Sequence, residues 1–340
     1  MKFAIWLPSY VYRDASLDHR QRLRDCIAAA EEAKLDIWVI DHLLTAPGLY
    51  GVTWLEPISV LTYAAALTSK VRLATGILVL PVRNPVILAK EIATLDYLSS
   101  GRYMFGVGTG WYGPEYEATG SRIEERGART DELLSAVRRL LTEDSVTFEG
   151  RFYSFRDVTI EPRPPKMPPV WVSGGGRVPD AASPDTVGIA PKVLERIVQA
   201  DGWLARSAAD IAMIMSDWAT IRAELLRQRG TLDGFTFGHA NFIHVVETDD
   251  EEEALRQQRP HFMDVMGSHR SFDQLRRSYL LGTPSQQVAR LTALQEAGCE
   301  YVVLGPTSDD PRQIDLMMRL VVDPVAAAAS ASRTDLTARA

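Results

Sequence analysis

The chain has 340 residues, of which 46% are hydrophobic and 24% are charged, and its formal net charge is −7. This composition is typical of a globular protein with a large core, and the excess of acidic side chains argues against nucleic acids and anionic membrane surfaces as partners. The N-terminal segment MKFAIWLPSYVYRD has one lysine, and Pro8 interrupts its apolar run. We therefore expect neither a signal peptide nor a membrane span, and a cytoplasmic protein.

Apolar runs typical of strands alternate with periodic segments typical of helices along the whole chain. The eight predicted strands span residues 2–8, 36–41, 71–79, 103–110, 169–175, 201–206, 235–246 and 301–306. The helices that follow them are predicted at residues 20–32, 57–68, 86–98, 122–141, 191–199, 208–229, 249–259 and 311–320. This alternation is typical of a parallel sheet covered by helices, and eight units favour a closed (β/α)8 TIM barrel over two Rossmann-like lobes. We predict a single α/β domain over residues 1–325 and a flexible tail over residues 326–340.

Three segments exceed a minimal barrel. Residues 146–158 alternate around a central Glu-Gly and predict a hairpin inserted after the fourth helix. Residues 177–190 follow the fifth strand and are rich in Pro, Asp and Ser, and residues 260–282 lie between the seventh and eighth strands. Long segments of this kind in compact domains are often lids or binding loops.

The spacing of cysteines and histidines indicates neither a disulfide nor a metal site. Cys26 and Cys299 lie in helix-patterned segments with apolar neighbours, which is typical of small core residues in a reducing compartment. His19, His261 and His269 have no ligand spacing with Asp, Glu or Cys. We therefore predict no metal.

Polar and glycine-rich motifs occur at the carboxyl ends of the predicted strands, where the loops of a barrel surround one mouth. In chain order they are Asp41-His42, ATGILVLPVRNP, GRYMFGVGTGWYGPEYEATG, PVWVSGG, DGW and LGTPSQQVARLTALQEAG. As an ordered set they resemble the bacterial-luciferase-like monooxygenase superfamily, whose members are flavin- or deazaflavin-dependent (β/α)8 enzymes. The resemblance covers residues 1–325 and implies a cofactor across the barrel mouth, with its ring over the strand ends.

The resemblance assigns cofactor-binding roles to residues at several strand ends. In relatives, a bulge after the third strand carries a non-proline cis peptide bond, which maps to Gly76–Ile77 here. Asp41, His42 and Thr109 match pocket residues, and Gly174–Gly175 match a pair that lines the phosphate. The cofactor-binding residues predicted from these matches and from the glycine-rich turns are Asp41, Gly76, Ile77, Thr109, Gly110, Ser173, Gly174, Gly175, Gly176 and Arg177.

Two glycine-rich turns have competing interpretations. Residues 108–113 satisfy G-x-G-x-x-G, but Pro114 follows the last glycine and two aromatic residues would crowd a pyrophosphate, so we reject a dinucleotide fingerprint. We expect these glycines to let the strand turn tightly and to admit the ring. Residues 173–176 can offer backbone N–H groups to an anion, and Arg177 favours a phosphate site over a merely flexible loop. Which residues of 177–193 complete that site stays open.

Three residues are predicted to be catalytic: His42, Trp111 and His239. His42 ends the second strand, where it is either a loop residue or a hydrogen-bond donor and proton shuttle beside a reduced flavin. Trp111 follows the fourth strand and either fills the core or walls a substrate cavity together with Trp6 and Tyr112. His239 shares a strand face with Asn241, and the prediction for His239 requires that this face point into the barrel.

These inferences favour a luciferase-like monooxygenase that uses reduced FMN and dioxygen to oxygenate a small organic substrate. Nothing in the sequence indicates a nicotinamide-binding domain, so we expect a separate flavin reductase as partner, and the family implies a homodimer. The alternative is a coenzyme F-420-dependent oxidoreductase that transfers hydride. The His, Trp and acidic set of sugar-phosphate dehydrogenases in that branch maps to His42, Ala46 and Trp111, so only the histidine is kept. A third alternative is a non-catalytic flavin-binding protein, although such proteins tend to have lost barrel elements.

Overall fold

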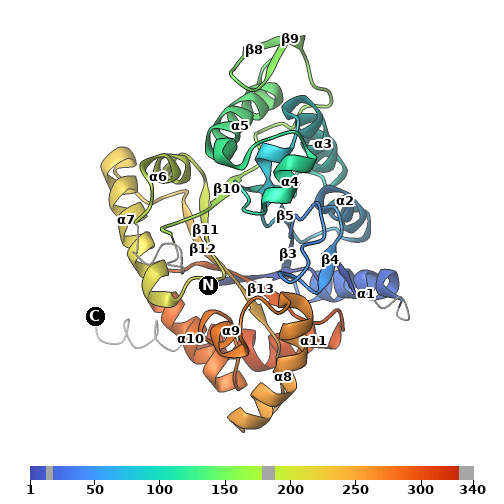
Figure 1. Ribbon diagram of the computed structural model, residues 1–340, viewed down its shortest axis with the longest axis vertical. Coiled ribbons are helices and arrows are strands. Elements are labelled where there is room, and N and C mark those ends of the chain that lie inside the picture. The colour runs from blue at the N-terminus through green and yellow to red at the C-terminus, as the bar shows by residue number, and fades with distance from the viewer. Residues whose placement is uncertain (13–17, 178–187, 329–340) are drawn as a thin grey trace.

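Eight parallel strands in the described part of the chain close into a barrel (Figure 1). The structure is a computed structural model, and it describes residues 1–12, 18–177 and 188–328. The barrel strands are β1 (Lys2–Trp6), β3 (Asp36–Val39), β5 (Leu73–Thr75), β7 (Tyr103–Gly108), β10 (Val170–Ser173), β11 (Gly202–Ala205), β12 (Thr236–Ile243) and β13 (Tyr301–Pro306). Pairing of β7 with β10 and of β13 with β1 completes the circle, so the predicted (β/α)8 barrel is confirmed.

Helices cover the outside of the barrel (Figure 1). They are α1 (His19–Glu32), α2 (Pro57–Leu67), α3 (Pro85–Leu98), α5 (Arg126–Thr142), α6 (Pro191–Val198), α7 (Ile211–Arg229), α10 (Pro284–Glu296) and α11 (Arg312–Met317), the last continuing as a π-helical turn over Met318–Val322. Local chemistry sets their starts. Asn84 and Thr283 accept hydrogen bonds from the first-turn N–H groups of α3 and α10, and a proline follows each of these caps.

The structure adds elements that the sequence patterns did not predict. Two short strands, β2 (Tyr10–Tyr12) and β4 (Val52–Trp54), pair in a small antiparallel sheet. They lie in the segments that follow β1 and β3. Helix α4 (Gly113–Ala118) and a 3-10 turn (Ile123–Glu125) precede α5, which therefore begins at Arg126 and not at residue 122. The loop after β5 holds β6 (Leu78–Val79) and a 3-10 turn (Leu80–Val82).

The predicted insertions are partly confirmed. Strands β8 (Val146–Glu149) and β9 (Ser154–Val158) form the expected hairpin, which projects beyond α5 in Figure 1. Of the segment 177–190, residues 178–187 lie outside the described residues. The helix predicted to end at residue 259 instead runs through Pro260 as α8 (Glu251–Met266), and α9 (Phe272–Ser278) follows it.

The continuation of α8 past Pro260 has a packing explanation. A proline inside a helix removes one backbone hydrogen bond. However, Phe262, Val265 and Met266 are all buried in the cluster that also fills the barrel interior. Burial of these side chains offsets the lost hydrogen bond and keeps the last turns helical.

Large aromatic side chains fill the lower part of the barrel interior. Trp38 Nε1 donates to Tyr301 Oη (3.0 Å), and Tyr301 Oη donates to Asp36 Oδ2 (2.7 Å). The ring of Trp171 contacts both Trp38 and Tyr301. Burial raises the pKa of Asp36, but hydrogen bonding to Lys2 and the charge of Arg72 outweigh it and lower that pKa. Trp38, Tyr301 and Asp36 thus have hydrogen-bond partners in this part of the barrel. The cavity that a ligand can use lies at the carboxyl end of the strands.

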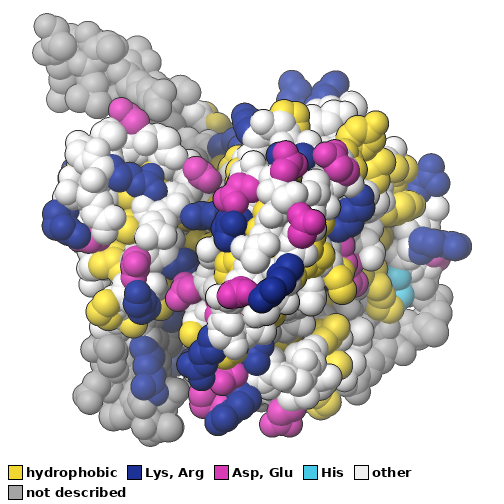
Figure 2. Space-filling model, turned by 90° about the horizontal axis from the view of Figure 1, so that it is seen from above, with side chains coloured by type: hydrophobic (Ala, Val, Ile, Leu, Met, Phe, Trp, Pro, Cys, Tyr) yellow, Lys and Arg dark blue, Asp and Glu magenta, His cyan; other side chains and the backbone are white. Residues whose placement is uncertain are grey.

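On the face shown in Figure 2, acidic and basic side chains are interspersed. Within residues 1–12, 18–177 and 188–328, no helix combines the length and apolar character needed to span a bilayer.

His239 lies on the outer face of β12, against the helices. The interior cluster contains Ala240 and Phe242, so by the alternation of a strand His239 and Asn241 point away from the barrel centre. Asn241 Nδ2 lies 3.2 Å from His239 Nε2 and donates to the Ser278 carbonyl. The inward face on which the catalytic prediction for His239 depended is therefore not observed. Burial lowers the pKa of His239 to about 4.

This depressed pKa predicts acid sensitivity. A histidine that stays neutral when folded but protonates when unfolded destabilises the fold as the pH falls from about 6.5 to about 4. Between pH 7 and pH 5, the wild-type protein should lose about 2 kcal/mol more unfolding free energy than His239→Gln. Urea denaturation at both pH values measures this difference, and equal losses in the two proteins would contradict the prediction.

Candidate active site

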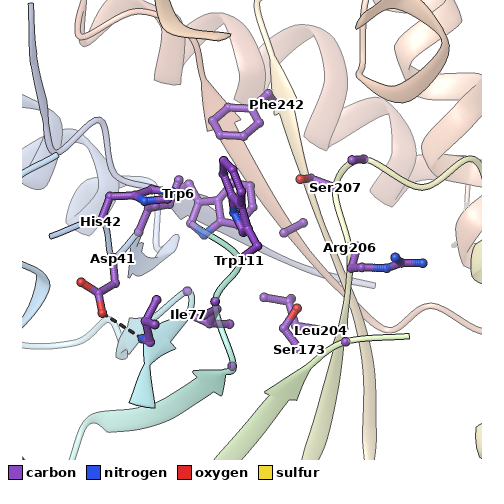
Figure 3. Close-up of a pocket in the computed structure, with 18 of the residues that line it drawn as sticks. Trp6, Asp41, His42, Ile77, Trp111, Ser173, Leu204, Arg206, Ser207 and Phe242 are labelled. Atoms are coloured by element: carbon purple, nitrogen blue, oxygen red, sulfur yellow. Dashed lines mark hydrogen bonds between the residues drawn. The ribbon is translucent and has the colours of Figure 1, made fainter. Parts of the chain in front are cut away.

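A cavity of about 560 Å³ opens at the carboxyl ends of the strands (Figure 3). The predicted residues that line it are Asp41, His42, Gly76, Ile77, Thr109, Gly110, Trp111, Ser173 and Gly174. Gly175, Gly176 and Arg177 are not among the lining residues, and neither is His239. Side chains from β1, β11 and β12 complete the wall, including Trp6, Leu204 and Phe242 (Figure 3).

The floor of the cavity is built where β5 bends into β6. The Gly76–Ile77 peptide bond is cis, as the sequence resemblance implied. A Cβ on Gly76 would lie 2.5 Å from Trp6 Nε1, and a Cβ on Gly108 would lie 2.6 Å from Ile77 Cδ1. A larger residue at either position would force its neighbour to move, so the two glycines let Trp6 and Ile77 pack against the backbone here. Gly110 then turns the chain with a φ of +71°.

Asp41 fixes the segment that follows this bend. Its Oδ2 accepts hydrogen bonds from the backbone N–H of Val79 (2.8 Å) and from Arg83 Nη2 (2.9 Å), and the first of these is drawn in Figure 3. Burial raises the pKa of Asp41, while the Arg83 guanidinium opposes that rise. Asp41 therefore connects the end of β3 to the cavity floor and already has its charge paired.

His42 is held by a buried carboxylate. Its Nδ1 lies 3.1 Å from Glu115 Oε1, which also accepts from the backbone N–H groups of Leu43 (2.9 Å) and Leu44 (3.3 Å). Glu115 is only 1% exposed. Because Glu115 Oε1 already accepts from two backbone N–H groups, we assign His42 Nδ1 as the donor in this contact, which leaves Nε2 outside it. Glu115 thus sets the tautomer and orientation of His42.

Aromatic rings surround His42 on its open side. The ring centroid of Tyr50 lies 5.0 Å away, that of Trp111 5.8 Å and that of Trp54 6.4 Å. Burial raises the pKa of Tyr50. Trp111 is 52% exposed although it lines the cavity, so it stands at the mouth and does not fill the core. This enclosure keeps water from the imidazole and offers flat apolar surfaces to a ligand.

The glycine-rich turn after β10 contacts a carboxylate of the protein itself. Both carboxylate oxygens of Asp217 accept from Gly176 N–H (3.0 and 2.9 Å). A Cβ on Gly175 would lie 2.3 Å from Asp217 Oδ2, so these two glycines adapt to an internal carboxylate. Burial raises the pKa of Asp217. The Gly176 N–H is therefore not free for a phosphate in this conformation.

A cationic side chain and a hydroxyl group lie next to that turn, directly after β11. Arg206 and Ser207 line the cavity together with Ser173 and Gly174, and in Figure 3 the guanidinium end of Arg206 points away from the rings of Trp6 and Trp111. Arg206 Nη2 is buried without a hydrogen-bond partner in the described residues, and it lies 3.8 Å from Asp217 Oδ2. The Arg206 side chain is 26% exposed, and a guanidinium with an unused N–H group can donate a hydrogen bond to a phosphate oxygen.

Sequence reasoning missed other wall residues. Glu115 was not among the predicted site residues, and its contact with His42 spans 73 positions of the chain. His269, Arg270 and Tyr279 come from the 260–282 segment, which was expected to supply a binding loop but not particular residues. Composition marks such a segment as functional, whereas tertiary packing decides which side chains enter the cavity.

A model of the luciferase-like monooxygenase family matches residues 1–301. The chain belongs to this family. The relatives in this family are monooxygenases and dehydrogenases, so the chain is an oxidoreductase.

Relatives within the luciferase-like family use two kinds of cofactor. The chain is 35% identical over 164 residues to an F420-dependent glucose-6-phosphate dehydrogenase of Kineococcus radiotolerans. That match spans 46% of the chain and 47% of the relative, about half of its length. The chain is 24% identical over 358 aligned positions to an FMNH(2)-dependent dimethylsulfone monooxygenase of Pseudomonas putida, which covers 90% of both proteins.

A solved structure shares the fold. An F420-dependent secondary alcohol dehydrogenase in complex with an F420-acetone adduct matches 95% of the chain and 98% of its own length, with a TM-score of 0.76 and 21% identity. The barrel architecture of this luciferase-like chain is therefore that of known redox enzymes, while the cofactor differs among its relatives.

The Glu115–His42 contact predicts a stability effect. Glu115→Ala removes a buried acceptor from two backbone N–H groups and from His42, so the unfolding free energy should fall by roughly 2–4 kcal/mol. Glu117→Ala, at an exposed position of the same helix, is the matched control and should change little. Chemical denaturation measures both variants, and equal stability would show that Glu115 does not hold the loop.

Proposed function

We propose that this protein is a monooxygenase of the two-component type, in which a separate reductase delivers reduced FMN and the barrel mouth binds it. Reduced FMN, when bound, supplies the electrons that activate dioxygen for transfer of one oxygen atom to a small organic substrate. The observation that carries the proposal is the cavity of about 560 Å³ at the carboxyl ends of the strands, where the Ile77 side chain packs against Gly108. A cavity of this size with mainly apolar walls suits a tricyclic ring.

The described residues fit such a cofactor at both of its ends. Ile77, Gly108 and Thr109 would support the ring, and Trp6 Nε1, buried without a hydrogen-bond partner among the described residues, offers an unused donor near Gly76. At the other end, Gly174, Arg206 and Ser207 would hold the phosphate. Gly174 is thus kept from the predicted phosphate-binding residues, and we propose Arg206 and Ser207 in place of Gly175, Gly176 and Arg177.

His42 would act on protons at the ring or the substrate. Its Nε2 is the atom left open by the Glu115 contact, and the imidazole lies within the aromatic enclosure of Tyr50, Trp54 and Trp111. The enclosure and Phe242 would exclude water from the reacting groups, which suppresses side reactions. We therefore keep His42 and Trp111 as proposed active-site residues and leave His239 out.

The F-420-dependent hydride transfer remains the second candidate, because the glucose-6-phosphate dehydrogenase relative uses that cofactor and is 35% identical over its matched half. The monooxygenase relative supports FMN over a far larger part of both chains. The two cofactors share a tricyclic ring and a phosphate, so the same cavity suits both. A non-catalytic flavin-binding role has no observation in its favour, because all eight barrel units are present.

We also propose a homodimer through α2 and α3. Large apolar side chains lie exposed on these adjacent helices: Ile87 is 61% exposed, Tyr97 70% and Leu98 52% on α3, and Tyr63 38% on α2. Several large exposed apolar side chains on neighbouring helices are typical of protein interfaces.

The cofactor is tested by anaerobic titration of the purified protein with reduced FMN and with F-420, followed by addition of dioxygen and mass-spectrometric detection of oxygenated products from a compound panel. We expect binding of reduced FMN and dioxygen-dependent product. Binding of F-420 alone, with reduction or oxidation of the panel but no oxygen insertion, would replace the monooxygenase by a dehydrogenase.

The role of His42 is tested by His42→Ala. Loss of a positioned proton donor or acceptor should reduce turnover by roughly 100-fold or more, with the affinity for FMN near that of the wild type. His261→Ala changes a half-buried histidine outside the cavity and should retain activity. Unchanged turnover in His42→Ala would remove the histidine from the mechanism.

A further inference from the structure

Arg270 brings a second positive charge to the cavity, far along the chain from Arg206. It lies between α8 and α9 and lines the cavity together with His269 and Tyr279. Its Nη2 donates to Tyr279 Oη (2.6 Å), its Nε donates to His269 Nε2 (3.1 Å), and its guanidinium carbon lies 5.0 Å from the centre of the Tyr279 ring. These neutral partners fix the side chain without neutralising its charge.

No carboxylate in residues 1–12, 18–177 and 188–328 lies within ion-pair distance of Arg270. The two acidic residues that line the cavity are already engaged, Asp41 by Arg83 and Glu115 by His42. A guanidinium stays charged at any physiological pH and has five N–H donors, of which the two contacts above use two. A half-buried, unpaired charge is costly unless a ligand pairs with it.

The segment that carries Arg270 is tied to the loop after β3. The Gly48 carbonyl accepts from the backbone N–H groups of Ser268 (3.2 Å) and His269 (3.0 Å), and Gly51 N–H donates to the Val265 carbonyl (3.2 Å). This loop also holds Tyr50, which contacts His42 and Trp111. Arg270 is therefore held on the side of the cavity where the aromatic enclosure lies, whereas Arg206 follows β11 beside Gly174.

We propose that the substrate has an anionic group, a carboxylate or a sulfonate-like oxyanion, that binds Arg270, and an apolar body that contacts the rings of Tyr50 and Trp111. The fork of a guanidinium matches two oxygens of such a group. The inference rests on the proposed function, because it assigns Arg206 to the cofactor phosphate and Arg270 to the substrate. The source of the anion is thus the substrate and not the cofactor.

The test separates the two arginines by measuring two ligands on each variant. Binding of benzenesulfonate and of benzyl alcohol, as anionic and neutral probes of similar shape, is followed by calorimetry on the cofactor-free protein, and FMN binding is measured separately. Arg270→Gln should weaken benzenesulfonate binding at least about tenfold and leave FMN affinity within about twofold. Arg206→Gln should weaken FMN binding and leave the affinity for benzenesulfonate nearly unchanged. Arg270→Lys should bind benzenesulfonate more tightly than Arg270→Gln does.

Arg277→Gln, an exposed arginine on α9 that does not line the cavity, is the matched control and should change neither affinity. The proposal is overturned if wild-type protein binds the neutral probe as well as the anion or fails to bind the anion, or if Arg270→Gln leaves anion binding unchanged. Loss of FMN binding in Arg270→Gln would assign this arginine to the cofactor phosphate and would also overturn it. Absence of FMN binding to wild-type protein, with the sulfonate result intact, would instead count against the proposed cofactor alone.

Discussion

Tight packing of indole rings against glycines inside the barrel determines where a ligand can bind. Trp171 fills the lower interior because a Cβ on Gly202 or Gly238 would approach its ring to 2.6 or 2.7 Å. Trp38 and Tyr301 pack against the same ring. This half of the barrel is occupied, and the cavity lies at the carboxyl end, where Trp6 and Phe242 pack against each other and line it. Glycines on some strands make room for large aromatic side chains from the facing strands. These side chains fill one end of the barrel and leave the other end open for a ligand.

The charges around the cavity divide into two groups with different tasks. The carboxylates of Asp41, Glu115 and Asp217 accept backbone N–H groups and thereby hold loops in place. The cations Arg206 and Arg270 line the cavity and retain donors that the described protein does not use. The acidic groups therefore hold the loops of the site in place, whereas the two arginines are the groups that we propose to contact ligands.

The sequence was sufficient where function depends on local pattern. The alternation of apolar strands and helices predicts the barrel, and residues directly at strand ends, such as His42, Ile77 and Thr109, do line the cavity. Which face of a strand points into the barrel was harder to predict. The segment 235–246 has apolar residues on both faces, so the sequence did not show whether Ala240 or His239 points inward. Contacts between distant segments, such as Glu115 with His42 or Arg270 with Tyr279, depend on tertiary packing and have no local signal.

A crystal structure of the protein with FMN bound tests the central idea most directly, because it places both ends of the cofactor at once. The expected result is a ring lying on the Gly76–Ile77 peptide beside Gly108, with the phosphate hydrogen-bonded to Arg206 or to the backbone of Gly174. A ring outside this cavity, or a phosphate seated on Arg270, would contradict the assignment of the barrel mouth.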